Sequence, residues 1–164
     1  MTTESPDAHP SAIASKNVNE WRTNHIRTAT LEFSRDRKSM SVLSKSAGKK
    51  DGNRLLVKGA PNLLIKRCTH IKLRDGTVKK LSGDLRRIIE AKTSELATRP
   101  LRCLALAVKE TRHLDRTLKD HSPDESEGNG DAARKHPLLS DHSKYADIES
   151  GLTLVGTFSK CFDI

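Results

Sequence analysis

The chain has 164 residues, a length typical of one domain, but only 34% of them are hydrophobic and 31% are charged, so part of the chain is expected to lie outside any packed core. A net charge of +9 favours an anionic partner, which leaves nucleotides, nucleic acids and membrane surfaces open. The longest apolar run, residues 103–108, is too short to cross a bilayer and no secretory or transit signal is recognisable, so we expect a soluble, cytosolic segment.

Residues 1–15 mix polar residues without a hydrophobic period, and we expect them to be disordered. The next segment, residues 16–27, is predicted to be a short helix, because its apolar and aromatic residues recur at roughly helical spacing. These residues are Val18, Trp21, His25 and Ile26.

Two short runs, residues 28–33 and 38–44, contain β-branched and apolar residues in partial alternation. With the charged turn 34–37 between them, they predict a hairpin in which Leu31 and Phe33 share one face of the strand pair.

A further strand is predicted over residues 54–58, ending at Gly59, after a polar loop. Pro61 suits the first turn of a helix that continues to about Arg67. A second hairpin is predicted around the dipeptide 75–76, Asp-Gly, because both residues accept the positive φ that a tight turn requires.

Ser82 is predicted to cap a helix that stops before Pro100. Residues 101–108 are apolar on both faces apart from Arg102, which predicts a buried strand whose guanidinium needs an anionic partner. Residues 111–150 show no hydrophobic period and are expected to form a polar loop or linker without regular structure.

A last strand is predicted at residues 152–155. Taken together, these elements predict an α/β fold, a mainly antiparallel sheet flanked by helices, with its folded centre in residues 16–110. The cysteines at 68, 103 and 161 are widely spaced and the nearest histidines, at 136 and 142, have no cysteine beside them, so we expect reduced thiols and no metal site.

Several stretches of the chain resemble a known family in content and in order. They are residues 30–42 (TLEFSRDRKSMSV), 58–61 (KGAP), 67–70 (RCTH), 101–107 (LRCLALA) and 146–156 (ADIESGLTLVG). The set resembles the nucleotide-binding domain of P-type cation pumps, and residues 30–42 are similar specifically to the sarcoplasmic and endoplasmic reticulum calcium pumps. The resemblance implies that residues 16–110 are part of such a domain, and that residues 151–164 add a terminal strand and a divergent tail.

With the resemblance, the candidate site residues are Phe33, Arg35, Lys38, Lys58, Gly59 and Arg102. A phenylalanine ring can stack on adenine, and an arginine and a lysine just beyond it can meet phosphate oxygens. The resemblance implies that Lys58 lines the adenine pocket and that Arg102 lies near the polyphosphate. Gly59 lacks a Cβ and so lets a ligand approach the backbone.

Each of these residues also has a purely structural interpretation. Phe33 could be a core phenylalanine, Arg35 and Lys38 could belong to a solvated turn, Lys58 could be an exposed strand-end lysine, and Arg102 could form a buried ion pair.

Motifs that the family needs for pumping are not found in the sequence. There is no D-K-T-G-T, T-G-D or G-D-G-x-N-D segment, no stretch before residue 28 resembling the one that carries the family's acidic adenine contact, and no D-P-P-R segment after residue 156. We therefore expect a truncated fragment that binds ATP or ADP weakly, without catalytic residues or a Mg²⁺ site of its own. The resemblance implies that the intact pump uses Mg²⁺ and ATP to move calcium across a reticulum or other cellular membrane, with this segment on the cytosolic side and the remainder of the pump as its partner.

Two other interpretations stay open. A partial sheet exposes apolar edges, so the chain could be a non-functional truncated gene product that does not fold stably. The basic charge would also suit a nucleic-acid-binding domain, although aromatics make up only 3% and no nucleic-acid-binding signature is recognisable. Such binding would be non-specific and would be lost as the salt concentration rises.

Overall fold

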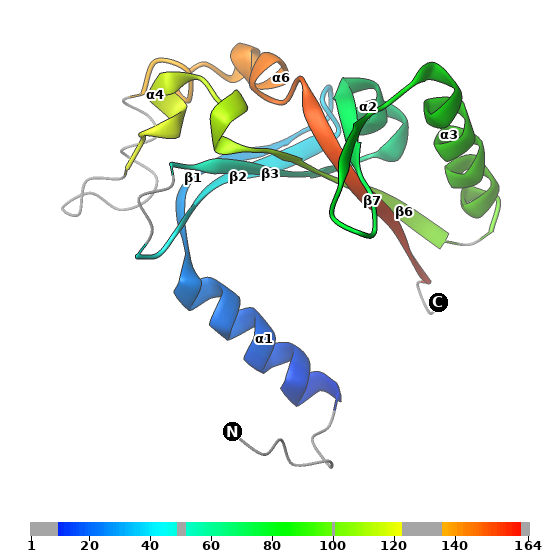
Figure 1. The fold of residues 1–164 in the computed structure, drawn as a ribbon, viewed down its shortest axis with the longest axis horizontal. Helices are drawn as coiled ribbons and strands as arrows, with labels where there is room; N and C mark the ends of the chain where they lie inside the picture. Colours follow the sequence, from blue (N-terminus) through cyan, green and yellow to red (C-terminus); the bar gives the residue numbers. More distant parts are fainter. Residues whose placement is uncertain (1–9, 49–51, 100, 123–135, 162–164) are drawn as a thin grey trace.

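The computed structural model describes residues 10–48, 52–99, 101–122 and 136–161. The centre of this part is a seven-stranded sheet with the strand order β1-β2-β3-β6-β7-β4-β5 (Figure 1). The strands are β1 (His25–Ser34), β2 (Ser39–Ser46), β3 (Arg54–Gly59), β4 (Cys68–Lys72), β5 (Val78–Lys80), β6 (Leu101–Lys109) and β7 (Leu152–Cys161). Neighbouring strands are antiparallel except β4 and β7, which confirms the predicted mainly antiparallel α/β sheet.

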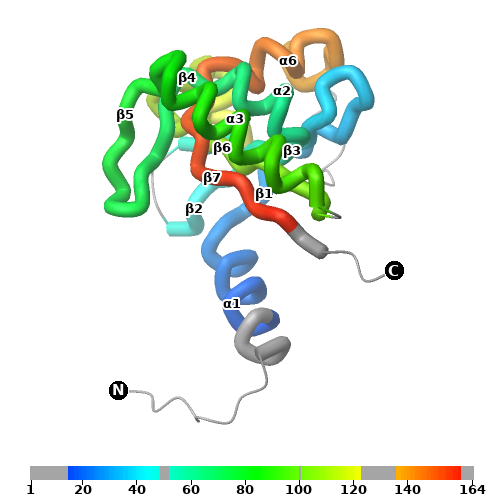
Figure 2. Tube along the Cα trace, turned by 90° about the vertical axis from the view of Figure 1, so that its right-hand side faces the viewer, coloured from blue at the N-terminus to red at the C-terminus, as the bar shows by residue number. Residues whose placement is uncertain are grey.

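Helices cover one face of the sheet. Figure 1 places α2 (Pro61–Arg67), α3 (Gly83–Ala97), α4 (Arg116–Lys119) and α6 (Tyr145–Ile148) on the same side. Two short 3₁₀ turns, η1 (Thr111–His113) and η2 (His142–Lys144), precede α4 and α6. The remaining helix, α1 (Pro10–Asn24), extends away from the sheet in both views (Figures 1 and 2). None of the described helices is long and apolar enough to span a membrane.

The core lies between the sheet and its covering helices. Leucine residues of the central strands, such as Leu43 and Leu55, are fully buried there against Leu64 and Ile65 of α2. Alternate residues of the same strands point to the opposite face, where the described helices do not pack. This arrangement makes the sheet apolar on both faces, and the helices of the described residues cover only one of them.

β6 was predicted to be buried on both faces. In the structure one of its two faces is exposed, because the described helices cover only the other. Ala105 and Ala107 face the core, whereas Leu106 is 39% exposed and Arg102 is also exposed. The error has a physical cause: a continuous apolar run predicts burial of both faces only when a second layer is present.

The first hairpin contains a β-bulge that the sequence pattern did not reveal. Leu31 pairs with Ser41 and Ser34 pairs with Ser39, so Glu32 and Phe33 of β1 lie opposite a single residue of β2. Because side chains alternate along a strand, one extra residue moves the following side chain to the other face. The prediction that Leu31 and Phe33 share a face was wrong: Leu31 is fully buried and Phe33 is 60% exposed.

The second hairpin was predicted correctly. β4 and β5 pair across a turn in which Gly76 has φ +86°, a conformation that glycine adopts without strain. Two hydrogen bonds from Thr77, through its hydroxyl and its backbone N–H, hold the Asp75 carboxylate and lower the pKa of that group.

Regular structure was missed in two segments. α1 begins at Pro10, inside the segment 1–15 expected to be disordered, of which residues 1–9 lie outside the described part. Within 111–150 the described residues form η1, α4, η2 and α6, so the expected absence of regular structure was wrong there. This part of the chain is anchored in the core by a few buried residues that are spaced without a regular period. These anchors are Leu118, Leu139, Tyr145 and Ile148.

Candidate functional site

A cavity of about 410 Å³ lies where β3 ends and β6 begins, beside the turn between β1 and β2. This volume is within the range of small-molecule sites. Its lining contains every candidate residue of the sequence analysis, namely Phe33, Arg35, Lys38, Lys58, Gly59 and Arg102. The structure thus brings together residues from three separate parts of the chain, 33–38, 58–59 and 102.

Phe33 reaches the cavity because of the β-bulge, which turns its ring away from the core. With 60% of its surface exposed, the ring is available for stacking, and the alternative of an ordinary core phenylalanine does not hold. Met40 and Leu104 line the cavity near it and extend its apolar surface.

The turn that carries Arg35 and Lys38 is closed by a hydrogen bond from the Lys38 N–H to the Ser34 carbonyl, 2.8 Å long. Lys38 has φ +47°, a left-handed conformation that is uncommon for a residue other than glycine. The N–H of Ala60 donates to the Lys38 carbonyl at 2.9 Å, so the end of β3 supports this conformation.

Gly59 also shapes the turn through close packing of the chain. A Cβ on Gly59 would lie 2.7 Å from the Lys38 carbonyl oxygen and 2.8 Å from the Ser39 Cβ. The missing side chain therefore lets β2 approach β3 closely. Gly59 contributes to the cavity by fixing the position of Lys38.

Lys58 and Arg102 lie on the uncovered face of the sheet and are both exposed. Among the described residues Arg102 forms no ion pair, so the interpretation as a buried pair does not hold. Together with Arg35 and Lys38 they surround the cavity with positive charge, and no acidic side chain is among its described lining residues. An apolar surface bordered by cations is the combination that a purine joined to phosphates requires.

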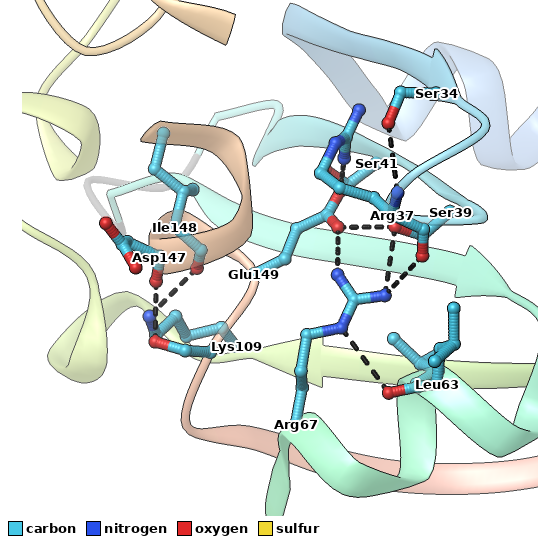
Figure 3. Close-up of polar contacts among 12 residues, drawn as sticks. Ser34, Arg37, Ser39, Ser41, Leu63, Arg67, Lys109, Asp147, Ile148 and Glu149 are labelled. Carbon is cyan, nitrogen blue, oxygen red and sulfur yellow. Dashed lines mark hydrogen bonds and ion pairs between the residues drawn. The ribbon is translucent and has the colours of Figure 1, made fainter. Parts of the chain in front are cut away.

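A buried ion-pair network lies behind this turn (Figure 3). The Glu149 carboxylate accepts hydrogen bonds from Arg37 Nη1 at 2.5 Å and from Arg67 Nη1 at 2.7 Å. The hydroxyls of Ser39 and Ser41 donate to the same carboxylate at 2.6 and 2.8 Å. Both of its oxygens are thus satisfied although the side chain is completely buried.

The network includes an aromatic contact. The Arg37 guanidinium carbon lies 5.0 Å from the centre of the Tyr145 ring. Burial raises the pKa of the Tyr145 hydroxyl, while the charge of Arg37 opposes the rise. That hydroxyl donates a hydrogen bond of 2.7 Å to the Leu139 carbonyl, which links the network to the segment before η2.

Sequence reasoning did not assign a role to Glu149, Arg37 or Arg67. One signal could have found the network: Ser39 and Ser41 occupy alternate positions of a strand that also carries Leu43, so their hydroxyls face the core. Buried hydroxyls need partners, which implies a polar group entering the core from elsewhere in the chain.

Two other features bear on the site. The described residues contain no group of three or more histidine, cysteine or acidic side chains arranged to hold a metal ion. A larger groove, about 830 Å³, lies at the opposite ends of β3 and β6 and includes Arg54, Lys72 and Lys119 in its lining. Its described lining has no phenylalanine, tyrosine or tryptophan, so it is less suited to adenine.

Comparisons with known proteins identify the family of the chain. The family model described as "P-type ATPase, cytoplasmic domain N" matches residues 8–160. The chain is 39% identical over 137 residues to the endoplasmic reticulum-type calcium-transporting ATPases 2 and 4 of Arabidopsis thaliana, an overlap of 83% of the chain. It is 34% identical over 143 residues, 84% of the chain, to a probable calcium-transporting ATPase of Trypanosoma brucei brucei. The chain spans 12% of the length of each of these relatives. It therefore belongs to the family of P-type ATPase cytoplasmic N domains.

Proposed function

We propose that the chain binds ATP and ADP in the cavity beside the β1–β2 turn, as part of a calcium-transporting P-type ATPase. The observation that supports this most directly is the convergence of Phe33, Lys58 and Arg102 on one cavity, although 25 and 44 residues separate them in sequence. The ring offers a stacking surface, and the cations offer partners for the phosphates.

In the intact pump, ATP binding at this site would serve calcium transport, with Mg²⁺ supplied at residues outside the described ones. The two relatives from Arabidopsis thaliana are of the endoplasmic reticulum type, which supports a place in that membrane with this segment on the cytosolic side. The remainder of the pump would be the partner of the domain. We expect no hydrolysis or transport from this chain alone.

The test is a titration of the purified chain with ATP and ADP, followed by NMR or by calorimetry. We expect a Kd of about 0.1–1 mM, which corresponds to only ~4 to 5.5 kcal/mol. Phe33→Ala, Lys58→Ala and Arg102→Ala should each weaken binding by ~1–3 kcal/mol, which the titration measures as a higher Kd. Lys72→Ala, in the groove at the opposite ends of the strands, is the matched control and should bind as the unmodified chain does.

Two results would contradict the proposal. One is a folded chain that shows no nucleotide binding at several times the expected Kd. The other is binding by all three cavity variants that equals binding by the unmodified chain. Sequence-specific DNA or RNA binding that survives ~200 mM salt would instead support the nucleic-acid interpretation.

A further inference from the structure

Glu149 is, among the described residues, the one charged residue that is completely buried. A buried carboxylate is costly unless it is fully paired, and removing a partner from such a pair is strongly destabilising. Its four partners do not come from one element: Arg37 and Ser39 flank the end of the β1–β2 turn, Ser41 lies in β2, and Arg67 ends α2. One carboxylate therefore fixes the position of several elements around the same turn.

The contacts converge on the part of the turn that carries the cavity's cations. Arg37 lies between Arg35 and Lys38, and besides Glu149 it donates to the Glu32 carbonyl. Arg67 donates from Nη2 to the Arg37 carbonyl at 2.8 Å and to the Ser39 hydroxyl at 3.2 Å. The residues on both sides of Lys38 are thereby held, which matters because Lys38 has the left-handed conformation of φ +47°. Such a conformation persists only when the surrounding structure supports it.

We propose that Glu149 is a positioning residue for nucleotide binding: through Arg37 and Arg67 it holds the turn so that Arg35 and Lys38 face the phosphates. This inference rests on the proposed function, because it assumes that the cavity takes a nucleotide. It adds a residue that is 112 positions from Arg37 in sequence and does not line the cavity itself.

Glu149→Gln is the variant that tests this role, since it keeps the size of the side chain and removes its charge. The first measurement needs no nucleotide. Hydrogen exchange at the amides of Lys38 and Ala60, which donate to Ser34 and Lys38, should accelerate on the order of tenfold. The amide of Asn53, which donates to the Lys119 carbonyl at the other end of β3, is the internal control and should keep its rate.

The second measurement separates positioning from general destabilisation. The affinity for ATP and ADP should fall by about fivefold or more, whereas adenosine, which lacks phosphates, should bind as before. A loss of folded structure would weaken both ligands equally. Glu149→Asp, which restores a carboxylate, should recover part of the ATP affinity.

If Glu149→Gln does not fold, Arg37→Gln provides the same test from the turn side, where 8% of the arginine side chain is already exposed. Unchanged exchange at Lys38 and Ala60, together with an unchanged ratio of ATP to adenosine affinity, would overturn the inference. Should the unmodified chain bind no nucleotide, the proposed function fails, while the exchange measurement still decides whether Glu149 positions the turn.

Discussion

Gly59 lies opposite Ser39 in the β2–β3 pair, at a point where the two backbones leave no room for a side chain. The nearest atom to an added methyl group would be the Lys38 carbonyl oxygen, which also accepts the Ala60 hydrogen bond. The two functions of this position, close strand pairing and support of the Lys38 conformation, therefore depend on the same absent Cβ.

Gly59→Ala should lower the free energy of unfolding by about 1–3 kcal/mol, because the added methyl group forces backbone atoms apart. It should also weaken nucleotide binding, since Lys38 must move. Gly83→Ala is the matched control: a Cβ there meets nothing within 4 Å, and the position opens α3, so the change should be neutral or stabilising by ~0.4–1 kcal/mol. Urea denaturation of both variants measures the difference, and equal stabilities would contradict this interpretation of Gly59.

A side chain of α3 donates hydrogen bonds to the end of α2 and to the first residue of β4. Arg86 in α3 donates to the carbonyl of Ile65 through Nη1 and to that of Cys68 through Nη2, the latter at 2.7 Å. The last carbonyls of a helix have no partner within the helix and carry partial negative charge, so a guanidinium suits them. The same region encloses the Cys68 thiol, whose burial raises its pKa to about 11 even though the charges of Arg86 and Arg67 lower it.

Arg86→Ala should cost about 1–3 kcal/mol of stability, because it removes a charged donor from each carbonyl and leaves that of Ile65 with the Cys68 N–H as its backbone donor. Arg87→Ala, one residue further along α3, should change stability by no more than about 0.5 kcal/mol, since that side chain is 78% exposed and pairs with the equally exposed Asp84. Thermal unfolding of the two variants measures the difference in stability. If Arg87→Ala loses as much stability as Arg86→Ala, the hydrogen bonds from Arg86 to the Ile65 and Cys68 carbonyls are not the cause of the loss.

At the scale of elements, the sequence predicted where the strands lie better than it predicted their irregularities and their contacts with distant residues. The run at residues 54–58 and the turn at Asp75-Gly76 indicated β3 and the β4–β5 hairpin, because alternation and turn chemistry are local signals. The bulge at Phe33 was not predictable, since one extra residue changes neither composition nor propensity. The residues lining the cavity were found through the family resemblance, whereas Glu149 was missed because its partners are brought near it only by the complete fold.

At the scale of the whole molecule, hydrogen bonds of one side chain connect β1 with the segment that follows β6. Asn53 accepts from the Thr28 hydroxyl and donates to the carbonyls of Leu118 and His121. The His121 ring is partly buried beside His136, with a ring-centre distance of 5.2 Å. Burial, with a smaller contribution from the charge of His136, lowers the pKa of His121.

Stability should therefore fall as the pH drops below about 6.5, the ordinary value for histidine. With the pKa lowered in the folded state, the unfolded chain binds a proton more readily in this range, so acidification favours unfolding. His121→Gln removes the proton-binding group and should lose less stability between pH 7.5 and 5.5 than the unmodified chain does. Urea midpoints at the two pH values provide the measurement, and parallel losses in both proteins would rule out His121 as the source.

The uncovered face of the sheet exposes apolar side chains that can promote self-association of the chain. Leu106, Val155 and Phe158 are 39, 48 and 46% exposed, and Leu106 and Val155 line a shared cavity with Met40 and Leu56 on that face. Contiguous apolar surface of this kind attracts other apolar surfaces.

We expect the chain to bind an apolar dye and to self-associate as its concentration rises. Leu106→Thr combined with Val155→Thr should reduce both effects without lowering strand propensity, because threonine is β-branched. Ile88→Thr in α3 is the control, since that residue is 64% exposed but lies on the helical side. Sedimentation velocity over a concentration series measures the association. If the Ile88 variant dissociates and the double variant does not, self-association takes place through the helical side and the sheet face is not its cause.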